Sequence, residues 1–401
     1  MRDAGFQPVI LCRYGYPDDQ ISDAKTYFPD SRERAIEEAG LRYNFLRRNP
    51  QARSLELDEY VAAATAEILD FVDRFPIDII QAASFAETCG LPALRAARIL
   101  GVPFAYEVRG LAHLTHGSLK PPWLMTDSHE RDLRAESECV QQADWVFAIT
   151  PQVKSDLIDL GAEERRTSLL PNSGDAAEFD TGHVSSSNKS DGQCVLQSKK
   201  IELVFAGGLT AYEGVIDLIR ALALVDPFGE SIELEIIGTG PEETYLRSAV
   251  PELHLESTVT FVGQLPLKEA LERVTEADLV VLPRENLAVT RHVAPIKIVD
   301  ALALGVPCLV PRLAALADIV TESGGGWVYE GFGAVAIAGA LEQIIGDRSS
   351  LRKAGERGRA WVLEHRSWSS VSVNLSEIYH SMVSNSSVHI SEPASAQVGA
   401  C

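Results

Sequence analysis

The chain has 401 residues, of which 46% are apolar and 23% are charged, and these values are ordinary for a globular protein. This length is sufficient for two domains of usual size. The formal net charge of −21 argues against nucleic acid or an anionic membrane as the main partner, because both need a basic face. Any phosphate-binding site must therefore be local.

The cysteines give no sign of a metal site or a disulfide framework. Their six positions show no Cys-x-x-Cys spacing. We therefore expect a reducing, cytoplasmic location. No charged-then-apolar leader and no apolar run near about eighteen residues can be read, so neither a secretory signal nor a transmembrane span is expected. Peripheral attachment to the inner face of a membrane stays open.

The first half of the chain alternates short apolar runs with amphipathic segments. We expect strands at residues 9–12, 77–83, 102–108, 145–149 and 167–170. Helices are expected at 60–75, 90–100, 130–143 and 152–160. Such alternation predicts a mostly parallel sheet with helices on both faces, in an α/β domain over residues 1–180.

The composition turns polar between residues 181 and 200, which we interpret as a domain linker. A second alternating run follows. Its strands are expected at 201–206, 234–237, 259–262 and 277–283, and its helices at 215–223, 242–249, 268–274, 333–345 and 352–365. The sequence thus predicts a second doubly wound, Rossmann-like domain over 201–367, then a helix at 368–383 that returns to the first domain and a disordered tail at 384–401.

The most informative segment follows the apolar run at 277–283. It carries a loop with one lysine, Lys297, and then a helix that is expected to open with Asp300 and end at Gly305. A helix amino terminus beside a cation favours an anion. Because this loop would leave the carboxyl end of a parallel strand, we predict that Lys297 holds a diphosphate and Asp300 a ribose.

Three segments carry a resemblance to a known family: Phe205-Ala-Gly-Gly-Leu-Thr-Ala-Tyr-Glu-Gly214, Pro171-Asn-Ser-Gly-Asp175 and Pro295-Ile-Lys-Ile-Val-Asp-Ala301. Together with the two-domain pattern they resemble the group-one, family-four glycosyltransferases of the GT-B fold, over nearly the whole chain. The resemblance implies a retaining enzyme that moves a sugar from a nucleoside-diphosphate sugar to a glycan or lipid-linked acceptor in surface polysaccharide assembly. It implies no cofactor, no protein nucleophile and no required metal.

Members of that family usually begin with a further strand, a glycine-rich loop and a helix. Residues 2–7 look like the end of that helix, so about one such unit is expected to be missing. Either a start codon chosen too far downstream or a truly shorter protein would explain the difference. A truly shorter protein would expose a sheet edge.

The resemblance assigns a role to several residues around the donor. Asp300 takes the position of the carboxylate that binds the ribose, although a first-turn aspartate could instead complement the helix dipole. His292 stands where a glutamate usually contacts the transferred sugar, as a substitute or as an exposed loop histidine. Gly207 and Gly208 would let the backbone approach the ligand. Gln264 follows a strand where the family meets the base.

The cations that neutralise the leaving diphosphate are expected on the facing loop. The family's arginine and lysine positions in the glycine loop hold Gly208 and Glu213, and neither residue is basic. We therefore predict Lys297, Arg291 and Arg284 in this role; the plainer interpretation is a solvated basic loop. In the first domain, Arg109 could contact the donor phosphate or the acceptor, or form an ion pair with Glu107.

Two other functions are weighed against this one. A noncatalytic sugar-nucleotide-binding scaffold or partner subunit is suggested by Gly208, Glu213, His292 and Asp300, which depart from the family pattern. A nicotinamide-dependent oxidoreductase is disfavoured because no Gly-x-Gly-x-x-Gly follows a strand. His113 and His116 lie three residues apart but lack a third ligand, so no metal site is expected.

Overall fold

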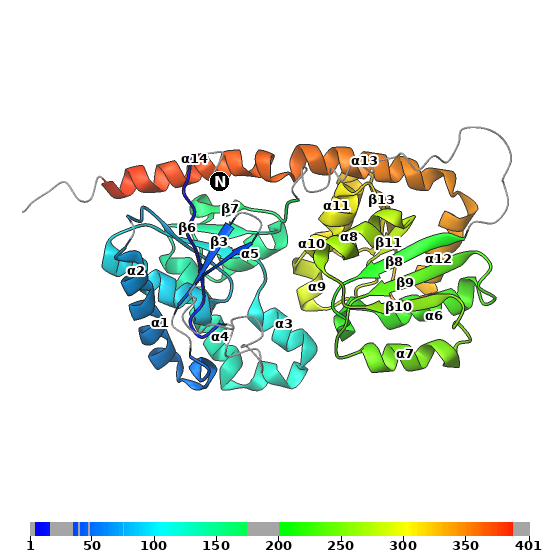
Figure 1. Ribbon diagram of the computed structural model, residues 1–401, viewed down its shortest axis with the longest axis horizontal. Coiled ribbons are helices and arrows are strands. Elements are labelled where there is room, and N and C mark those ends of the chain that lie inside the picture. The colour runs from blue at the N-terminus through cyan, green and yellow to red at the C-terminus, as the bar shows by residue number, and fades with distance from the viewer. Residues whose placement is uncertain are drawn as a thin grey trace, which may run out of the picture. The chain divides into compact units, whose positions relative to one another are not determined.

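The computed structural model describes residues 5–16, 35–38, 41–46, 49–74, 76–174 and 200–387. The chain divides into two compact units (Figure 1). Unit 1 holds Met1–His113, Pro122–Leu170 and Ser372–Cys401, and unit 2 holds Leu114–Pro121 and Pro171–Val371. The linker predicted at 181–200 lies, except for Lys200, outside the described residues, and so does the predicted tail beyond 387.

The described strands of unit 1 form two sheets. One is parallel, in the order β4-β5-β6-β7, and the other has the order β1-β3-β2. In the second sheet β2 runs antiparallel to β3, a pair that was not predicted from the sequence. The strands are β1 (Ile10–Cys12), β2 (Ala35–Glu38), β3 (Leu41–Phe45), β4 (Ile80–Ala83), β5 (Phe104–Val108), β6 (Trp145–Ala148) and β7 (Thr167–Leu169).

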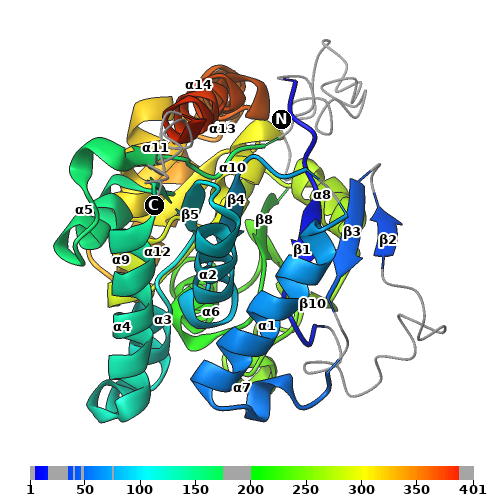
Figure 2. The ribbon, with the colours of Figure 1, turned by 90° about the vertical axis from the view of Figure 1, so that its left-hand side faces the viewer.

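Helices of unit 1 pack on these sheets through apolar stripes. In α1 (Leu57–Val72), Tyr60, Ala64, Ile68 and Val72 recur every four residues and are all buried, as one face of a helix requires. Figure 2 shows α1 beside α2, which it contacts extensively. The other helices are α2 (Leu91–Leu100), α4 (Asp127–Gln142) and α5 (Pro151–Asp159); α3 (Ala112–Leu119) begins in unit 1, and α14 (Trp368–Ser387) ends there.

Unit 2 is built on one six-stranded parallel sheet. Its order is β10-β9-β8-β11-β12-β13. The strands are β8 (Ile201–Ala206), β9 (Ile232–Ile237), β10 (Val259–Gly263), β11 (Leu279–Val281), β12 (Cys308–Pro311) and β13 (Gly326–Tyr329). The helices are α6 (Val215–Val225), α7 (Glu243–Glu252), α8 (Leu267–Glu276), α9 (Ala288–His292), α10 (Ile296–Ala303), α11 (Ala314–Ser323), α12 (Ala334–Gly346) and α13 (Ser349–His365).

Successive residues of the central strand, β8, pack into hydrophobic clusters on opposite faces of the sheet. Leu203 and Phe205 of β8 belong to a cluster with α6, α7 and α12, whereas Val204 belongs to a cluster with α8, α10, α11 and α13. This is the alternation that a strand buried on both faces requires. The doubly wound architecture predicted for the second half is therefore confirmed.

The strand order of unit 2 reverses between β8 and β11. From β8 the chain adds β9 and β10 on one side, then returns to place β11 on the other side of β8. In open α/β sheets, ligands bind outside the carboxyl ends of the strands at such a reversal. The loop after β8 begins at Gly207, and the segment after β11 carries Arg284, so two predicted site segments meet at this point.

The prediction that the helix ending at Gly305 opens with Asp300 is wrong. α10 begins at Ile296, so Lys297 lies in its first turn rather than in a loop, and Asp300 lies one turn further on. A short helix, α9, precedes it. The cause is Pro295: its fixed φ of −74° suits the residue that caps a helix, so the helix starts immediately after it.

Candidate functional site

The glycine loop of unit 2 is folded tightly against the segment after β11. The loop ends with a 3-10 turn, η7 (Ala211–Glu213), and Gly214 has a φ of +68°. A Cβ atom at Gly214 would lie 2.0 Å from the carbonyl oxygen of Pro283. Only glycine allows this approach, which brings Glu213 beside Arg284.

Glu213 is a buried carboxylate that binds two cations. Arg284 donates from Nη2 to Oε1 at 2.8 Å and from Nε to Oε2 at 3.3 Å. Lys297 donates from Nζ to Oε2 at 3.0 Å. The Glu213 and Arg284 side chains are 5% and 7% exposed, and that of Lys297 is 19% exposed. Two cations and one anion leave this cluster with one net positive charge.

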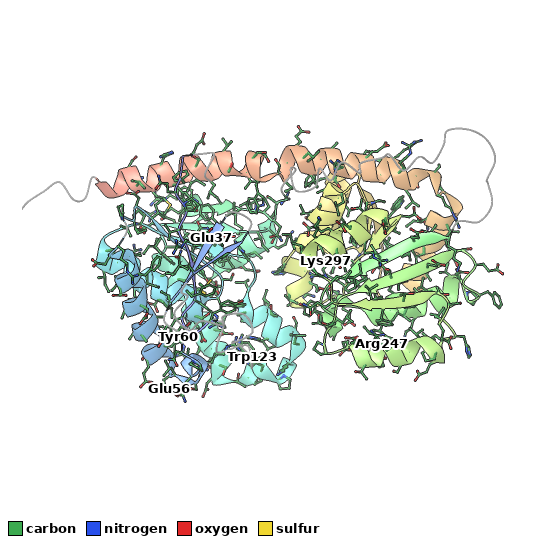
Figure 3. The ribbon with its side chains drawn as sticks, in the orientation of Figure 1. Glu37, Glu56, Tyr60, Trp123, Arg247 and Lys297 are labelled. Carbon is green, nitrogen blue, oxygen red and sulfur yellow. The ribbon has the colours of Figure 1, made fainter. Side chains whose placement is uncertain are left out.

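Lys297, which is labelled in Figure 3, lies against the glycine loop. Its Nζ is 4.6 Å from the centre of the Phe205 ring, and a Cβ atom at Gly207 would lie 2.2 Å from this nitrogen. An ammonium group has three hydrogen-bond donors. Among the described residues, its one hydrogen-bond acceptor is Glu213. The other N–H groups of the ammonium therefore remain available for hydrogen bonds beside the loop.

The environment shifts the pKa values of both groups. Burial raises the pKa of the Glu213 carboxyl, but Arg284 and Lys297 lower it more, so that it stays below its ordinary value. Burial lowers the pKa of the Lys297 ammonium; Glu213 raises it and Arg284 lowers it, and the result is below the usual lysine value. Glu213 is thus the one of these three influences that favours the charged lysine.

Each of the three nitrogens of the Arg284 guanidinium donates a hydrogen bond inside the protein. Besides Glu213, it donates from Nη1 to the carbonyl oxygen of Val293 at 3.1 Å, and its guanidinium lies 5.7 Å from the Tyr212 ring centre. A side chain that is 7% exposed does not fit the interpretation as a solvated basic loop. Arg284 contributes positive charge and fixes the position of Glu213.

A second pair of glycines, Gly238 and Gly240, lets a neighbouring loop pack against the glycine loop. A Cβ atom at Gly238 would lie 2.0 Å from the Gly207 carbonyl oxygen, and one at Gly240 would lie 2.4 Å from that of Leu209. Leu209 donates its backbone N–H to Thr239 at 2.9 Å. Gly238 and Gly240 therefore allow two loops to pack closely. This packing explains the Gly-Thr-Gly pattern, which does not match the glycine pattern of dinucleotide-binding proteins.

The other predicted residues of unit 2 differ in how far they are exposed. Arg291 is exposed on α9 and donates to Asn286 Oδ1 at 3.2 Å. His292 ends α9 and is half-buried, as is Asp300 in α10. Gln264 is exposed directly after β10. Asn172, in the segment that carries the family resemblance, donates to the carbonyl oxygen of Ala294, just before α10.

Arg109 lies in unit 1, directly after β5. Its Nε donates to Glu107 Oε1 at 2.7 Å, which is the ion pair that the sequence suggested as the plainer alternative. The Arg109 side chain is nevertheless 61% exposed, whereas that of Glu107 is 8% exposed. One nitrogen is thus used internally, and the rest of the guanidinium faces solvent.

The role of Glu213 was not predicted from the sequence, where this position stood out only as one that is not basic. The signal available was an acidic residue in a glycine loop where a cation is expected, because a buried acid needs a basic partner. His113 and His116 form no metal cluster: the part of the chain that the structure describes has no group of three potential ligands.

Two models of glycosyltransferase families match the chain. Residues 187–361 match the family described as glycosyl transferases group 1, and residues 1–173 match the glycosyl transferase 4-like domain. A curated relative, 2-deoxystreptamine glucosyltransferase of Streptomyces kanamyceticus, is 23% identical over 313 residues, which are 76% of this chain and 78% of the relative.

Solved structures share the fold. Sucrose-phosphate synthase of Thermosynechococcus elongatus superposes with a TM-score of 0.69 at 18% identity, covering 88% of this chain and 86% of that one. HepE of Anabaena, in complex with UDP and glucose, gives 0.67 at 16% identity, covering 93% and 98%. The fold is therefore GT-B. The two family matches lie one in each half of the chain, and this protein belongs to the group 1 glycosyltransferases with a glycosyl transferase 4-like amino-terminal domain.

Proposed function

We propose that this glycosyltransferase is a retaining enzyme whose donor is a nucleoside-diphosphate sugar and whose acceptor is a hydroxyl of a glycan or lipid-linked glycan, in surface polysaccharide assembly. The observation that carries the donor assignment is Lys297: an ammonium with spare donors, beside a glycine loop at the strand-order reversal of unit 2. The structure of HepE is a complex with UDP and glucose, which supports the same donor class.

In this proposal each residue acts on a different part of the donor. Lys297 and Arg291 neutralise the diphosphate, with Arg284 adding its charge from behind Glu213. The backbone of Gly207 and Gly208 lies along the diphosphate. A further set, in unit 2, binds the rest of the donor: Asp300 the ribose, His292 the sugar, and Gln264 the base.

The reaction breaks the bond between the anomeric carbon and the β-phosphate oxygen and forms one between that carbon and the acceptor oxygen. The acceptor's proton passes to the departing diphosphate, so no protein base is needed. Attack and departure on one face would retain the configuration. Arg109 in unit 1 binds a phosphate or the acceptor with its exposed nitrogens. Side-chain cations, rather than a metal, balance the developing charge.

A donor panel tests this function. Purified protein is incubated with UDP-, GDP- and ADP-linked sugars, and release of the free nucleoside diphosphate is followed over time, with and without candidate glycan acceptors. Release from one donor class, with a product whose anomeric configuration by NMR equals that of the donor, is the expected result. Binding without any release, in this chain and in one extended upstream, would instead favour the scaffold.

No helix in the described ranges combines the length and apolarity needed to cross a membrane. Peripheral association with the inner face of a membrane stays part of the proposal, and its test is co-sedimentation of the protein with vesicles.

A further inference from the structure

Glu213 has no place in the donor contacts proposed above, yet it is the most buried charged group of the site. Its carboxylate accepts from Arg284 at 2.8 and 3.3 Å and from Lys297 at 3.0 Å. Burial of an isolated carboxylate is costly. Two cations from separate segments, Arg284 after β11 and Lys297 in α10, meet that cost here.

The geometry fixes where the Lys297 ammonium lies. Phe205 of β8 bounds it on one side at 4.6 Å, Gly207 on another, and Glu213 on a third. Lysine has a flexible stem with rotatable donors, so without an anchor its head group would not stay at one point. Glu213 supplies that anchor, and Arg284 in turn holds Glu213 with two hydrogen bonds.

The same contact governs the charge of the lysine. The charged groups facing Lys297 are Glu213 from η7 and Arg284 from the segment after β11. Burial and Arg284 both favour the neutral amine, and Glu213 alone opposes them. A neutral amine would no longer attract a diphosphate. The charge of Lys297 therefore depends on a residue that is not among the proposed donor contacts.

We propose that Glu213 is a positioning residue that keeps Lys297 charged and directed at the glycine loop for the diphosphate of the donor. This inference rests on the proposed function for its ligand. It explains why an acidic residue is compatible with an anion site: the acid is behind the lysine, and the cluster keeps one net positive charge.

The test uses the full chain and UDP as the probe. Dissociation constants are measured by calorimetry over a series of pH values that extends from neutral well into the alkaline range, because the pKa of Lys297 lies below the usual lysine value. Each variant is compared with the unmodified protein at the same pH, which cancels the titration of UDP itself. Uridine, which lacks the diphosphate, is the control ligand.

Glu213→Gln should weaken UDP binding by about 10- to 100-fold at the alkaline end, the usual effect of losing a charge-assisted contact. Affinity should recover as the pH falls and Lys297 regains its proton. In Glu213→Gln/Lys297→Arg the dependence should vanish, because arginine does not deprotonate in this range. Glu213→Asp keeps the charge and should keep the pH profile, with altered affinity only.

Matched controls separate positioning from general damage. Glu235→Gln removes a half-buried carboxylate of β9 that pairs with Arg273 of α8 at 3.1 Å, and should leave affinity and pH profile unchanged. Thermal unfolding shows whether Glu213→Gln is folded. If it is not, Glu213→Asp and Glu213→Asp/Lys297→Arg carry the comparison.

A ligand-free measurement keeps the two proposals apart. The ¹³Cε signal of Lys297, assigned by its loss in Lys297→Arg, is titrated in the unmodified protein and in Glu213→Gln or, if that variant is unfolded, Glu213→Asp. A lower titration midpoint in Glu213→Gln, or a shifted signal position in Glu213→Asp, supports the inference. Unchanged titration, or UDP affinity that is unmoved at every pH, overturns it while leaving the proposed function intact. No binding of UDP, GDP or ADP to the unmodified protein would overturn the donor assignment.

Discussion

Tyr379 of α14 donates a hydrogen bond to Gln81 Oε1 on β4, across 298 positions of sequence. Gln81 Nε2 then donates to Glu107 Oε2 at 2.8 Å, and Glu107 Oε1 accepts from Arg109 at 2.7 Å. The terminal helix is thus linked through three side chains to a predicted site residue of unit 1. In this row of hydrogen bonds, Gln81 accepts on one side and donates on the other. Only one orientation of its amide therefore satisfies both partners.

Tyr379→Phe should destabilise unit 1. The change leaves Gln81 Oε1 without its donor in a half-buried setting, and such a loss costs about 1–2 kcal/mol. Urea denaturation followed by tryptophan fluorescence measures it. Ser384→Ala, which removes an exposed hydroxyl that bonds only within α14, is the control and should shift the midpoint little. Equal midpoints for the two variants would show that the link to Gln81 contributes nothing.

Lys297→Ala should abolish sugar transfer while leaving the fold intact. Removing a cation that stabilises a developing diphosphate costs about 100- to 1000-fold in rate. Initial rates with saturating donor measure the effect, and circular dichroism checks the fold. Lys268→Ala, at an 87% exposed side chain of α8, is the matched control. Turnover close to that of the unmodified protein would remove Lys297 from the catalytic machinery.

The architecture of unit 2 could be predicted from its sequence because each element carries its own local signal. Apolar runs mark β8 and β9, and amphipathic periodicity marks α6 and α7, so the doubly wound pattern follows without knowledge of contacts. Unit 1 was harder: β2 and β3 contain Glu37, Glu38, Arg42 and Asn44. β2 shows no apolar alternation. β3 does alternate, with Leu41, Tyr43 and Phe45 separated by Arg42 and Asn44, and this short pattern was the available signal for a strand.

The site was predictable by segment but not by contact. The sequence pattern indicated Gly207, Arg284 and Lys297 as site residues, and the structure places them at one strand-order reversal. It could not show that Glu213 joins Arg284 and Lys297, since these residues are 71 and 84 positions from it. Nor could it place Lys297 within the first turn of α10, because helix starts are decided by a capping residue, here Pro295, as much as by periodicity.

Asp300→Asn should weaken nucleotide binding through the ribose. An aspartate accepts two vicinal hydroxyls, and an amide can accept through only one oxygen, so a loss of about 10-fold or more is expected. The sharper comparison uses the 2′,3′-dideoxy form of the nucleoside diphosphate that binds best. With that ligand, Asp300→Asn and the unmodified protein should bind alike. An equal loss with both ligands would assign Asp300 to the structure of α10 instead.

Removal of divalent metal should leave the transfer rate unchanged. In the proposed mechanism Lys297 and Arg291 supply the positive charge that a bound cation supplies elsewhere. The rate is measured after exhaustive dialysis against EDTA and again after addition of Mg²⁺ or Mn²⁺. Loss of activity on chelation, with recovery on addition of either ion, would contradict the proposal that side chains alone balance the diphosphate.

Unit 2 should lose stability in acid through Glu213. The folded-state pKa of this carboxyl lies below its ordinary value of 4.5, so the charged form stabilises the fold above the unfolded pKa. That contribution disappears as the pH falls from 4.5 through the lower folded value, where protonation of Glu213 leaves Arg284 and Lys297 facing each other unpaired. Urea midpoints measured across this range should fall more steeply for the unmodified protein than for Glu213→Gln, which has no proton to gain. Glu235→Gln, with its carboxylate removed from a more exposed pair, should follow the unmodified curve. Parallel curves for Glu213→Gln and the unmodified protein would mean that the two cations do not depend on this carboxylate for their burial.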